Sequence, residues 1–214
     1  PRNILRMGTV WLMKDRAGKV GAHGVGPLVK HVLDETEARL HLVGHSFGAR
    51  VVLSSLAIAT VKRQARSMLL LQPAVNRWCF AKDVIGVGRP GGYRSVLERV
   101  ELPIMTTLSK HDVPLRQAFH LAVRGSSLGE PDIAAVGDTD RYGALGGYGP
   151  AGIDDVLDAQ DAHAPGDAYP FAAGKEVIAL NGGIDINGKA AIGGHGDINN
   201  PITWWALHGL TGAS

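Results

Sequence analysis

One short segment restricts the fold more than any other part of this 214-residue chain: Gly44-His45-Ser46-Phe47-Gly48, a Gly-x-Ser-x-Gly pattern. Residues 38–43 before it form an apolar-rich run of strand length, and residues 49–61 after it are rich in alanine and leucine at helical spacing. A strand, a sharp turn and a helix in this order hold the serine hydroxyl above the carboxyl end of a sheet. We therefore expect Ser46 to be a nucleophile, the alternative being an ordinary glycine-rich turn with an incidental serine.

The residues around the serine are expected to serve the turn and its chemistry. Ser46 itself should take a strained backbone conformation. Gly44 and Gly48 lack the side chains that would stop the turn from closing against the neighbouring strand and helix. The start of the helix directs backbone N–H groups towards the serine, so the amide of Phe47 is the predicted donor to a developing oxyanion.

A nucleophilic serine needs a base, and the base needs an acid that orients it. Three more strand-like runs follow the serine, in the rhythm of a parallel sheet with crossovers: residues 67–72, 102–108 and 176–180. Asp112 lies just after the second of these runs. His195 lies after the third, in a glycine-bounded loop. We predict that Asp112 is the orienting acid and that His195 is the general base.

Each of these assignments has an alternative. His195 could be a structural loop histidine that caps a backbone carbonyl. Three other aspartates also lie near predicted loop ends, where a carboxylate commonly caps a turn: Asp83, Asp185 and Asp197. His111 is adjacent to Asp112, and neighbouring side chains on an extended segment point apart, so the two cannot both face Ser46.

With these residues in place, the chain resembles the α/β-hydrolase superfamily over most of its length. The resemblance is carried by the elbow at residues 44–48, by His111-Asp112-Val113-Pro114 after a later strand and by His195 after the last strand, in the family's order of Ser, Asp and His. Three further segments are similar to a poorly characterised bacterial group of that family: residues 13–18, 141–146 and 195–205.

The resemblance implies a single domain of the α/β class, with a mostly parallel sheet and helices on both faces. It implies a serine hydrolase that acts without a cofactor on a small-molecule acyl substrate, an ester rather than an amide. Two rivals stay open: a non-catalytic binding module of the same fold, and an acyltransferase or perhydrolase that uses the same triad.

In this family a second oxyanion donor comes from a loop upstream of the elbow. We find only one plausible strand there, at residues 9–13, followed by a helix at residues 26–35. We therefore expect the chain to be the carboxyl-terminal part of a longer protein, without the N-terminal strands of the fold. Residues 40–43 should then lie at an unpaired edge of the sheet.

Two regions after the acid complete the expected domain. Residues 124–170 are rich in glycine, aspartate and alanine, and we expect them to form an irregular insertion. The insertion is positioned to cover the acyl pocket, although a surface excursion without functional contact is equally compatible. Residues 201–210 are expected to form a closing helix, capped by Asn199-Asn200-Pro201 and packed on the sheet by Trp204 and Trp205.

Composition and the remaining motifs exclude several other classes. A formal net charge of +2 gives no reason to expect nucleic-acid binding, and no apolar run reaches the roughly 18 residues of a membrane span. The single cysteine, Cys79, rules out an internal disulfide and leaves the compartment open, with the cytoplasm favoured.

Residues 86–91 and 147–152 match Gly-x-Gly-x-x-Gly, but neither follows a convincing strand, so we expect loops rather than a dinucleotide site. His41 and His45 would lie roughly 13 Å apart on a strand, so no metal site is expected.

Overall fold

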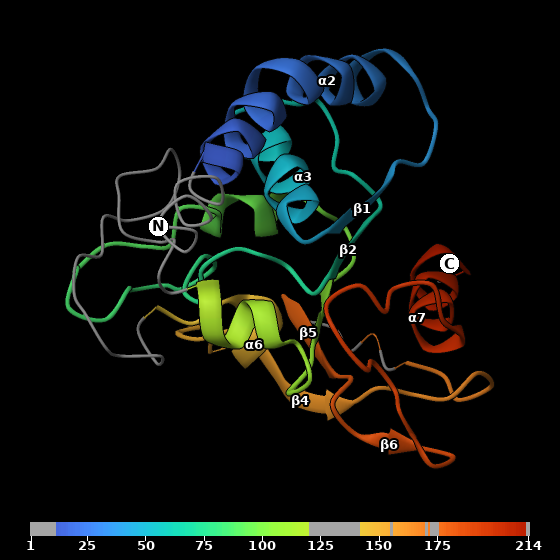
Figure 1. The fold of residues 1–214 in the computed structure, drawn as a ribbon. Helices are drawn as coiled ribbons and strands as arrows, with labels where there is room; N and C mark the ends of the chain where they lie inside the picture. Colours follow the sequence, from blue (N-terminus) through green and yellow to red (C-terminus); the bar gives the residue numbers. More distant parts are fainter. Residues whose placement is uncertain (1–11, 120–141, 155, 170, 172–175, 213–214) are drawn as a thin grey trace.

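The computed structural model describes residues 12–119, 142–154, 156–169, 171 and 176–212. Within them lies a five-stranded sheet in the order β1-β2-β3-β5-β4, in which every pairing is parallel (Figure 1). Its strands are β1 (His41–His45), β2 (Ser67–Leu71), β3 (Ile104–Leu108), β4 (Val156–Asp161) and β5 (Val177–Asn181). A small antiparallel hairpin consists of β6 (Asp185–Ile186) and β7 (Lys189–Ala190). The α/β class expected from the sequence is confirmed.

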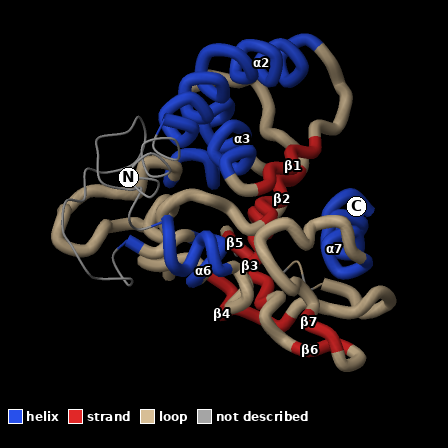
Figure 2. Tube along the Cα trace, in the orientation of Figure 1, coloured by secondary structure: helices blue, strands red, loops and turns tan. Residues whose placement is uncertain are grey.

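Helical segments lie between successive strands from β1 to β4, whereas β4 to β7 follow one another without a described helix. Figure 2 shows the helices and strands in different colours. Among the described residues, the helical segments include η1 (Val20–Val25), α2 (Gly26–Glu35), α3 (Phe47–Ala57), η2 (Arg94–Arg99), η3 (Pro114–Ala118), α6 (Leu145–Tyr148) and α7 (Pro201–Gly212). The predicted strands at residues 67–72, 102–108 and 176–180 correspond to β2, β3 and β5, and the helices predicted after the elbow and at the carboxyl end correspond to α3 and α7.

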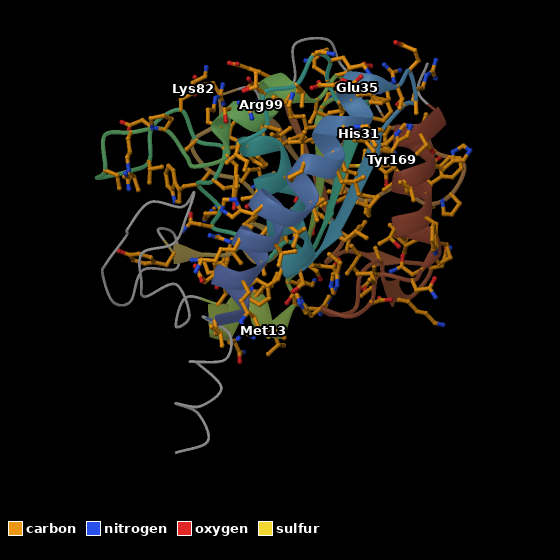
Figure 3. The ribbon with its side chains drawn as sticks, turned by 90° about the horizontal axis from the view of Figure 1, so that it is seen from above. Met13, His31, Glu35, Lys82, Arg99 and Tyr169 are labelled. Carbon is orange, nitrogen blue, oxygen red and sulfur yellow. The ribbon has the colours of Figure 1, made fainter. Side chains whose placement is uncertain are left out.

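The amino-terminal part of the described chain is helical rather than extended. Residues 12–19 form an α-helix that continues through η1 into α2, and Figure 3 shows Met13 near one end of this helical run, with His31 and Glu35 towards the other. The predicted strand at residues 9–13 is therefore wrong at Leu12 and Met13, and its other residues lie outside those described. Buried positions recur at helical spacing through the run. This packing decides the structure more strongly than the strand preference of the apolar residues at the start of the run. The helix predicted at residues 26–35 is confirmed as α2.

Alternate residues of β2 contribute to two cores, one on each face of the sheet. On β2, Met68 and Leu70 pack in a cluster with residues of α2 and α3, whereas Leu69 and Leu71 pack in a second cluster with residues of α7. In Figure 1, α2 and α3 accordingly lie on one side of the sheet and α7 on the other. Helices therefore cover both faces, as expected.

The two edges of the sheet differ from each other in how well the sequence predicted them. Among the described residues, β1 pairs only with β2, and Val43 is 43% exposed, so the unpaired edge expected at residues 40–43 is present there. The existence of further strands upstream stays a prediction. At the opposite edge, β4 lies inside residues 124–170, for which the sequence predicts an irregular insertion. This strand was missed because a segment with two aspartates has weak strand propensity, and its pairing with β5 decides its structure.

The last helix is fixed at its start by one side chain. Asn200 Oδ1 accepts hydrogen bonds from the backbone N–H groups of Ile202 and Thr203, both at 3.0 Å, which confirms the predicted cap. Trp205 packs against the second core, whereas Trp204 is 58% exposed and donates to Asn199. The prediction for Trp204 is wrong because neighbouring helical positions face directions about 100° apart, so only one of the two tryptophans faces the sheet.

Candidate active site

Ser46 occupies a strained turn between β1 and α3. Its backbone has φ 54° and ψ −122°, a region that residues other than glycine rarely adopt. Three backbone hydrogen bonds hold the turn: Ser46 N–H donates to Leu71 at 3.1 Å, and the Ser46 carbonyl accepts from Ala49 at 3.2 Å and from Ala74 at 3.1 Å. The strained strand-to-helix elbow predicted from the sequence is therefore present.

The two glycines of the pattern do not have the same role. A Cβ atom on Gly44 would lie 2.7 Å from backbone atoms of Ala49 and Gly48, closer than packed atoms approach. A Cβ atom on Gly48 would have nothing within 4 Å. The steric requirement expected for both residues thus holds for Gly44 and is wrong for Gly48, the second residue of α3, where the space is open.

Three side chains from distant parts of the chain form one line of hydrogen bonds. His195 Nε2 lies 2.8 Å from Ser46 Oγ, and His195 Nδ1 lies 2.8 Å from Asp112 Oδ2, although the partners are 149 and 83 positions apart in sequence. With Asp112 ionised, Nδ1 carries the ring proton, and Nε2 is free to accept the hydroxyl proton of Ser46. The arrangement suits a serine activated by an imidazole base.

The environment of Asp112 matches the role of an orienting acid. The residue is fully buried, and its second oxygen accepts a hydrogen bond of 3.0 Å from the backbone N–H of Leu115, at the start of the helical turn after β3. Both carboxylate oxygens therefore have donors, so the carboxylate is held towards His195, whose side chain is 24% exposed. A buried carboxylate is tolerated when it is paired and hydrogen-bonded in this way.

The competing aspartates lie elsewhere. Asp83 and Asp185 are exposed. Asp197 accepts a 2.7 Å hydrogen bond from the backbone N–H of Gly193 and braces the loop that carries His195. His111, next to Asp112, has a buried Nε2 without a hydrogen-bond partner in the described residues, and it is His195 that bonds Ser46.

Three residues that sequence reasoning did not assign to the site hold the loop of His195. His45 Nε2 donates to the carbonyl of His195 at 2.8 Å, Gln72 Nε2 donates to that of Gly194 at 2.9 Å, and Ser109 Oγ donates to that of Ile192 at 2.7 Å. Each is a polar residue at or just after the carboxyl end of a strand, which is the signal that could have identified them. The spacing of His45 from His41 suggests at most a metal ligand and gives no sign of this contact.

Residues beside the elbow form a small apolar cluster. Phe47 packs on a buried group made of Ala74, Leu115, Phe119 and Ala144. Phe47 is also the first residue of α3, so its backbone N–H has no acceptor within the helix. Its predicted role as an oxyanion donor is compatible with this position and stays a prediction.

Part of the expected insertion lies beside the carboxyl ends of β2 and β3. Gly146 donates to the carbonyl of Pro73 at 3.1 Å, and its own carbonyl accepts from Ser109 at 3.1 Å. A Cβ atom on Gly146 would lie 2.4 Å from the backbone of Gln72, so α6 sits directly on the segment that follows β2. Residues 120–141 lie outside those described, so the idea that the insertion covers an acyl pocket stays a prediction.

The remaining motifs do not form a ligand site. Residues 86–91 lie in turns, and residues 147–152 run from the end of α6 into irregular chain, so neither joins a strand to a helix. His41 Nδ1 is 2.8 Å from Ser67 Oγ on the neighbouring strand, away from the contact of His45. In the part of the chain that the structure describes, no group of three or more His, Cys, Asp or Glu side chains is arranged to hold a metal ion, and no helix is long and apolar enough to span a membrane.

No protein-family model matches the chain, and no curated protein or solved structure matches it.

Proposed function

We propose that the protein is a serine hydrolase of the α/β-hydrolase fold that cleaves an ester bond through an acyl-enzyme. The observation that carries the proposal is the hydrogen-bonded line from buried Asp112 through His195 to Ser46. The strained elbow supports it further, as does the order of the three residues, with Ser46 after β1, Asp112 after β3 and His195 after β5 of a parallel sheet.

In the first half-reaction, Ser46 Oγ attacks the acyl carbonyl carbon while His195 Nε2 takes the hydroxyl proton. The carbonyl electron pair moves to its oxygen, and the Phe47 N–H is the proposed donor to that oxyanion. Asp112 keeps the proton on Nδ1 and stabilises the positive imidazolium. The tetrahedral intermediate then collapses, and the leaving alkoxide takes the proton from Nε2 and departs as the alcohol.

In the second half-reaction, water takes the place of the alcohol. His195 removes a proton from the water as its oxygen attacks the Ser46 ester, and the returning proton restores the hydroxyl of Ser46 as the acid leaves. The chemistry needs only the groups of this chain and water. Phe47, the partly exposed residue packed on the buried cluster beside the nucleophile, is the proposed contact for the acyl chain.

A fluorophosphonate probe tests the proposal, because it reacts covalently with an activated serine. The parent protein should be labelled at Ser46, and Ser46→Ala should remove both the label and ester turnover. Ser95→Ala, at an exposed position of η2, is the matched control and should behave as the parent does. Labelling that survives Ser46→Ala would refute the assignment, and a parent that resists the probe would favour the non-catalytic binding module.

An acceptor other than water is the second candidate reaction, and product analysis separates it. Turnover of one ester in the presence of competing alcohols or of peroxide should yield mainly the free acid if the enzyme is a hydrolase. A predominance of the exchanged ester or the peracid would identify an acyltransferase or a perhydrolase instead.

A further inference from the structure

The loop that carries the base, residues 192–197, forms neither helix nor strand and is called here the histidine loop. Backbone carbonyls in such a segment need hydrogen-bond donors from elsewhere when water is excluded. The side chains of His45, Gln72 and Ser109 provide donors to three of its carbonyls. One backbone hydrogen bond, from the Ile192 N–H to the carbonyl of Gly182 at 2.7 Å, also holds the start of the histidine loop. These three carbonyls are thus bonded by side chains rather than by strand pairing.

The three donors follow the order of the sheet. His45 is the last residue of β1, and Gln72 and Ser109 are the first residues after β2 and β3, which are neighbours in the order β1-β2-β3. Their acceptors are the carbonyls of His195, Gly194 and Ile192, in that sequence. The histidine loop thus runs across three consecutive strand ends and is bonded to each of them.

The middle donor has a fixed orientation. Thr107 Oγ1 accepts a 2.8 Å hydrogen bond from the backbone N–H of Gln72 and donates to Gln72 Oε1 at 3.3 Å. Because Oε1 takes this proton, Nε2 is the atom that faces the carbonyl of Gly194. Gln72 and Thr107 are both buried, and Gln72 has a φ of 34°, so the backbone conformation at Gln72 is itself strained to give this position.

His45 has the most direct connection to the reaction. A carbonyl can only accept, so His45 Nε2 must carry a proton to bond the carbonyl of His195. The two rings also lie side by side, with their centroids 5.0 Å apart. Since His45 precedes Ser46 on the elbow, this bond ties the backbone of the base to the strand that carries the nucleophile.

We propose that His45 is a positioning residue, which fixes the distance between His195 and Ser46, and that Gln72 and Ser109 fix the rest of the histidine loop. The inference rests on the proposed serine hydrolase function. His45 does not touch the reacting atoms, so it acts through the placement of His195. A displacement of about 1 Å in such a pair costs on the order of 100-fold in rate.

Two variants of His45 test the role of its N–H group. His45→Phe keeps a ring but removes the donor, and we expect kcat and the rate of fluorophosphonate labelling to fall roughly 10- to 100-fold with little change in KM. His45→Gln has an Nε2 donor the same number of bonds from the backbone, and it should recover most of the lost rate. Equal losses in both variants, a rise in KM alone, or parental rates in His45→Phe would overturn the proposal.

Amide hydrogen exchange gives a readout that does not need catalysis. In a Ser46→Ala background, His45→Phe should speed exchange in residues 192–197, and His45→Gln should slow it again. Unchanged exchange in His45→Phe would overturn the positioning role even if the parent proved to be inactive, whereas failure of labelling in the parent would count against the proposed function alone. If His45→Phe does not fold, Ser109→Ala and Ser109→Thr form the equivalent pair for the carbonyl of Ile192.

Discussion

At the scale of single residues, the two glycines of the Gly-x-Ser-x-Gly pattern have different roles in the elbow. Gly44 must lack a side chain because α3 turns back over the end of β1, and the backbone of Ala49 occupies the space that a Cβ atom would need. Gly48 lies within α3, where a methyl group would meet nothing within 4 Å. In a helix, alanine is favoured over glycine by about 1 kcal/mol.

We therefore predict opposite effects for Gly44→Ala and Gly48→Ala. Gly44→Ala should lower the free energy of unfolding by several kcal/mol, because backbone rather than a flexible side chain must move, and it should abolish labelling of Ser46. Gly48→Ala should leave the protein as stable as the parent or more stable by about 1 kcal/mol. Urea unfolding of both variants checks this, and equal destabilisation would contradict the account of the elbow.

The acid offers a second prediction at this scale. Asp112→Asn should cut turnover by roughly 10⁴-fold while the fold remains, because an amide that donates to Nδ1 places the ring proton on Nε2 and removes the base. Asp197→Asn is the matched control, since Asp197 braces the histidine loop without touching the ring. Steady-state rates together with circular dichroism make the comparison, and a larger loss in Asp197→Asn would mean that the acid is misassigned.

At the scale of elements, the end of α2 is capped by a different segment of the chain. The Arg63 guanidinium donates to the carbonyls of Val32, Thr36 and Ala38, and Asp34 accepts a 2.7 Å hydrogen bond from the backbone N–H of Lys62. A positive charge at the carboxyl end of a helix is favourable because it faces the negative end of the helix dipole. The link holds α2 to the connection between α3 and β2, on the side of the sheet opposite α7.

This cap predicts a dependence of stability on pH. The hydrogen bond from Lys30, with that from the Lys62 N–H, holds the pKa of Asp34 below its usual value of 3.8. A lowered pKa in the folded state stabilises the protein above the unfolded pKa, and that contribution is lost as the pH falls through the folded pKa. Asp34→Asn should therefore be less stable than the parent near neutral pH, and the difference should shrink as the pH falls below about 4 and vanish below the lowered pKa of the folded protein.

Glu35→Gln is the control for this prediction. Its carboxylate is 56% exposed and lies 3.4 Å from Lys62 Nζ, so the change should have little effect at any pH. Thermal unfolding of the three proteins between about pH 2 and 7, a range that extends well below the usual pKa of an aspartate, provides the measurement. A stability difference for Asp34→Asn that does not shrink towards the acid end would show that the ionised carboxylate is not its cause.

At the scale of the whole molecule, the two cores share the same strands. Met68 and Leu70 belong to the core under α2 and α3, and Leu69 and Leu71, between and after them, belong to the core under α7. Because both cores depend on the same strands, disruption of the strands removes the packing of both cores. The two faces of the sheet should therefore unfold together.

We predict one unfolding transition for the protein. Urea curves followed by far-ultraviolet circular dichroism and by tryptophan fluorescence should coincide, and Leu69→Ala and Leu70→Ala should each shift both curves together. Each substitution should cost roughly 2 to 5 kcal/mol, the usual range for truncating a buried leucine. Separate transitions for the two probes, or a variant that shifts only one of them, would show that the faces are independent units.

Local pattern alone determined the elbow, the order of Ser46, Asp112 and His195, and the strands and helices with strong periodicity. These features depend on turn chemistry and on the spacing of apolar residues. Both can be read from residues that are close together in the sequence. Tertiary structure decided what depends on distant partners: that residues 12–19 extend a helix, that β4 completes the sheet, and that Trp204 faces solvent.

The same division runs through the candidate site. A sequence can place Asp112 after a strand, but only folding determines that its carboxylate, rather than that of Asp197, lies 2.8 Å from His195. The roles of His45 and Gln72 also appear only in the tertiary structure, because their acceptors are carbonyls 150 and 122 positions away. Every backbone carbonyl looks alike in a sequence, and burial decides which of them needs a side-chain donor.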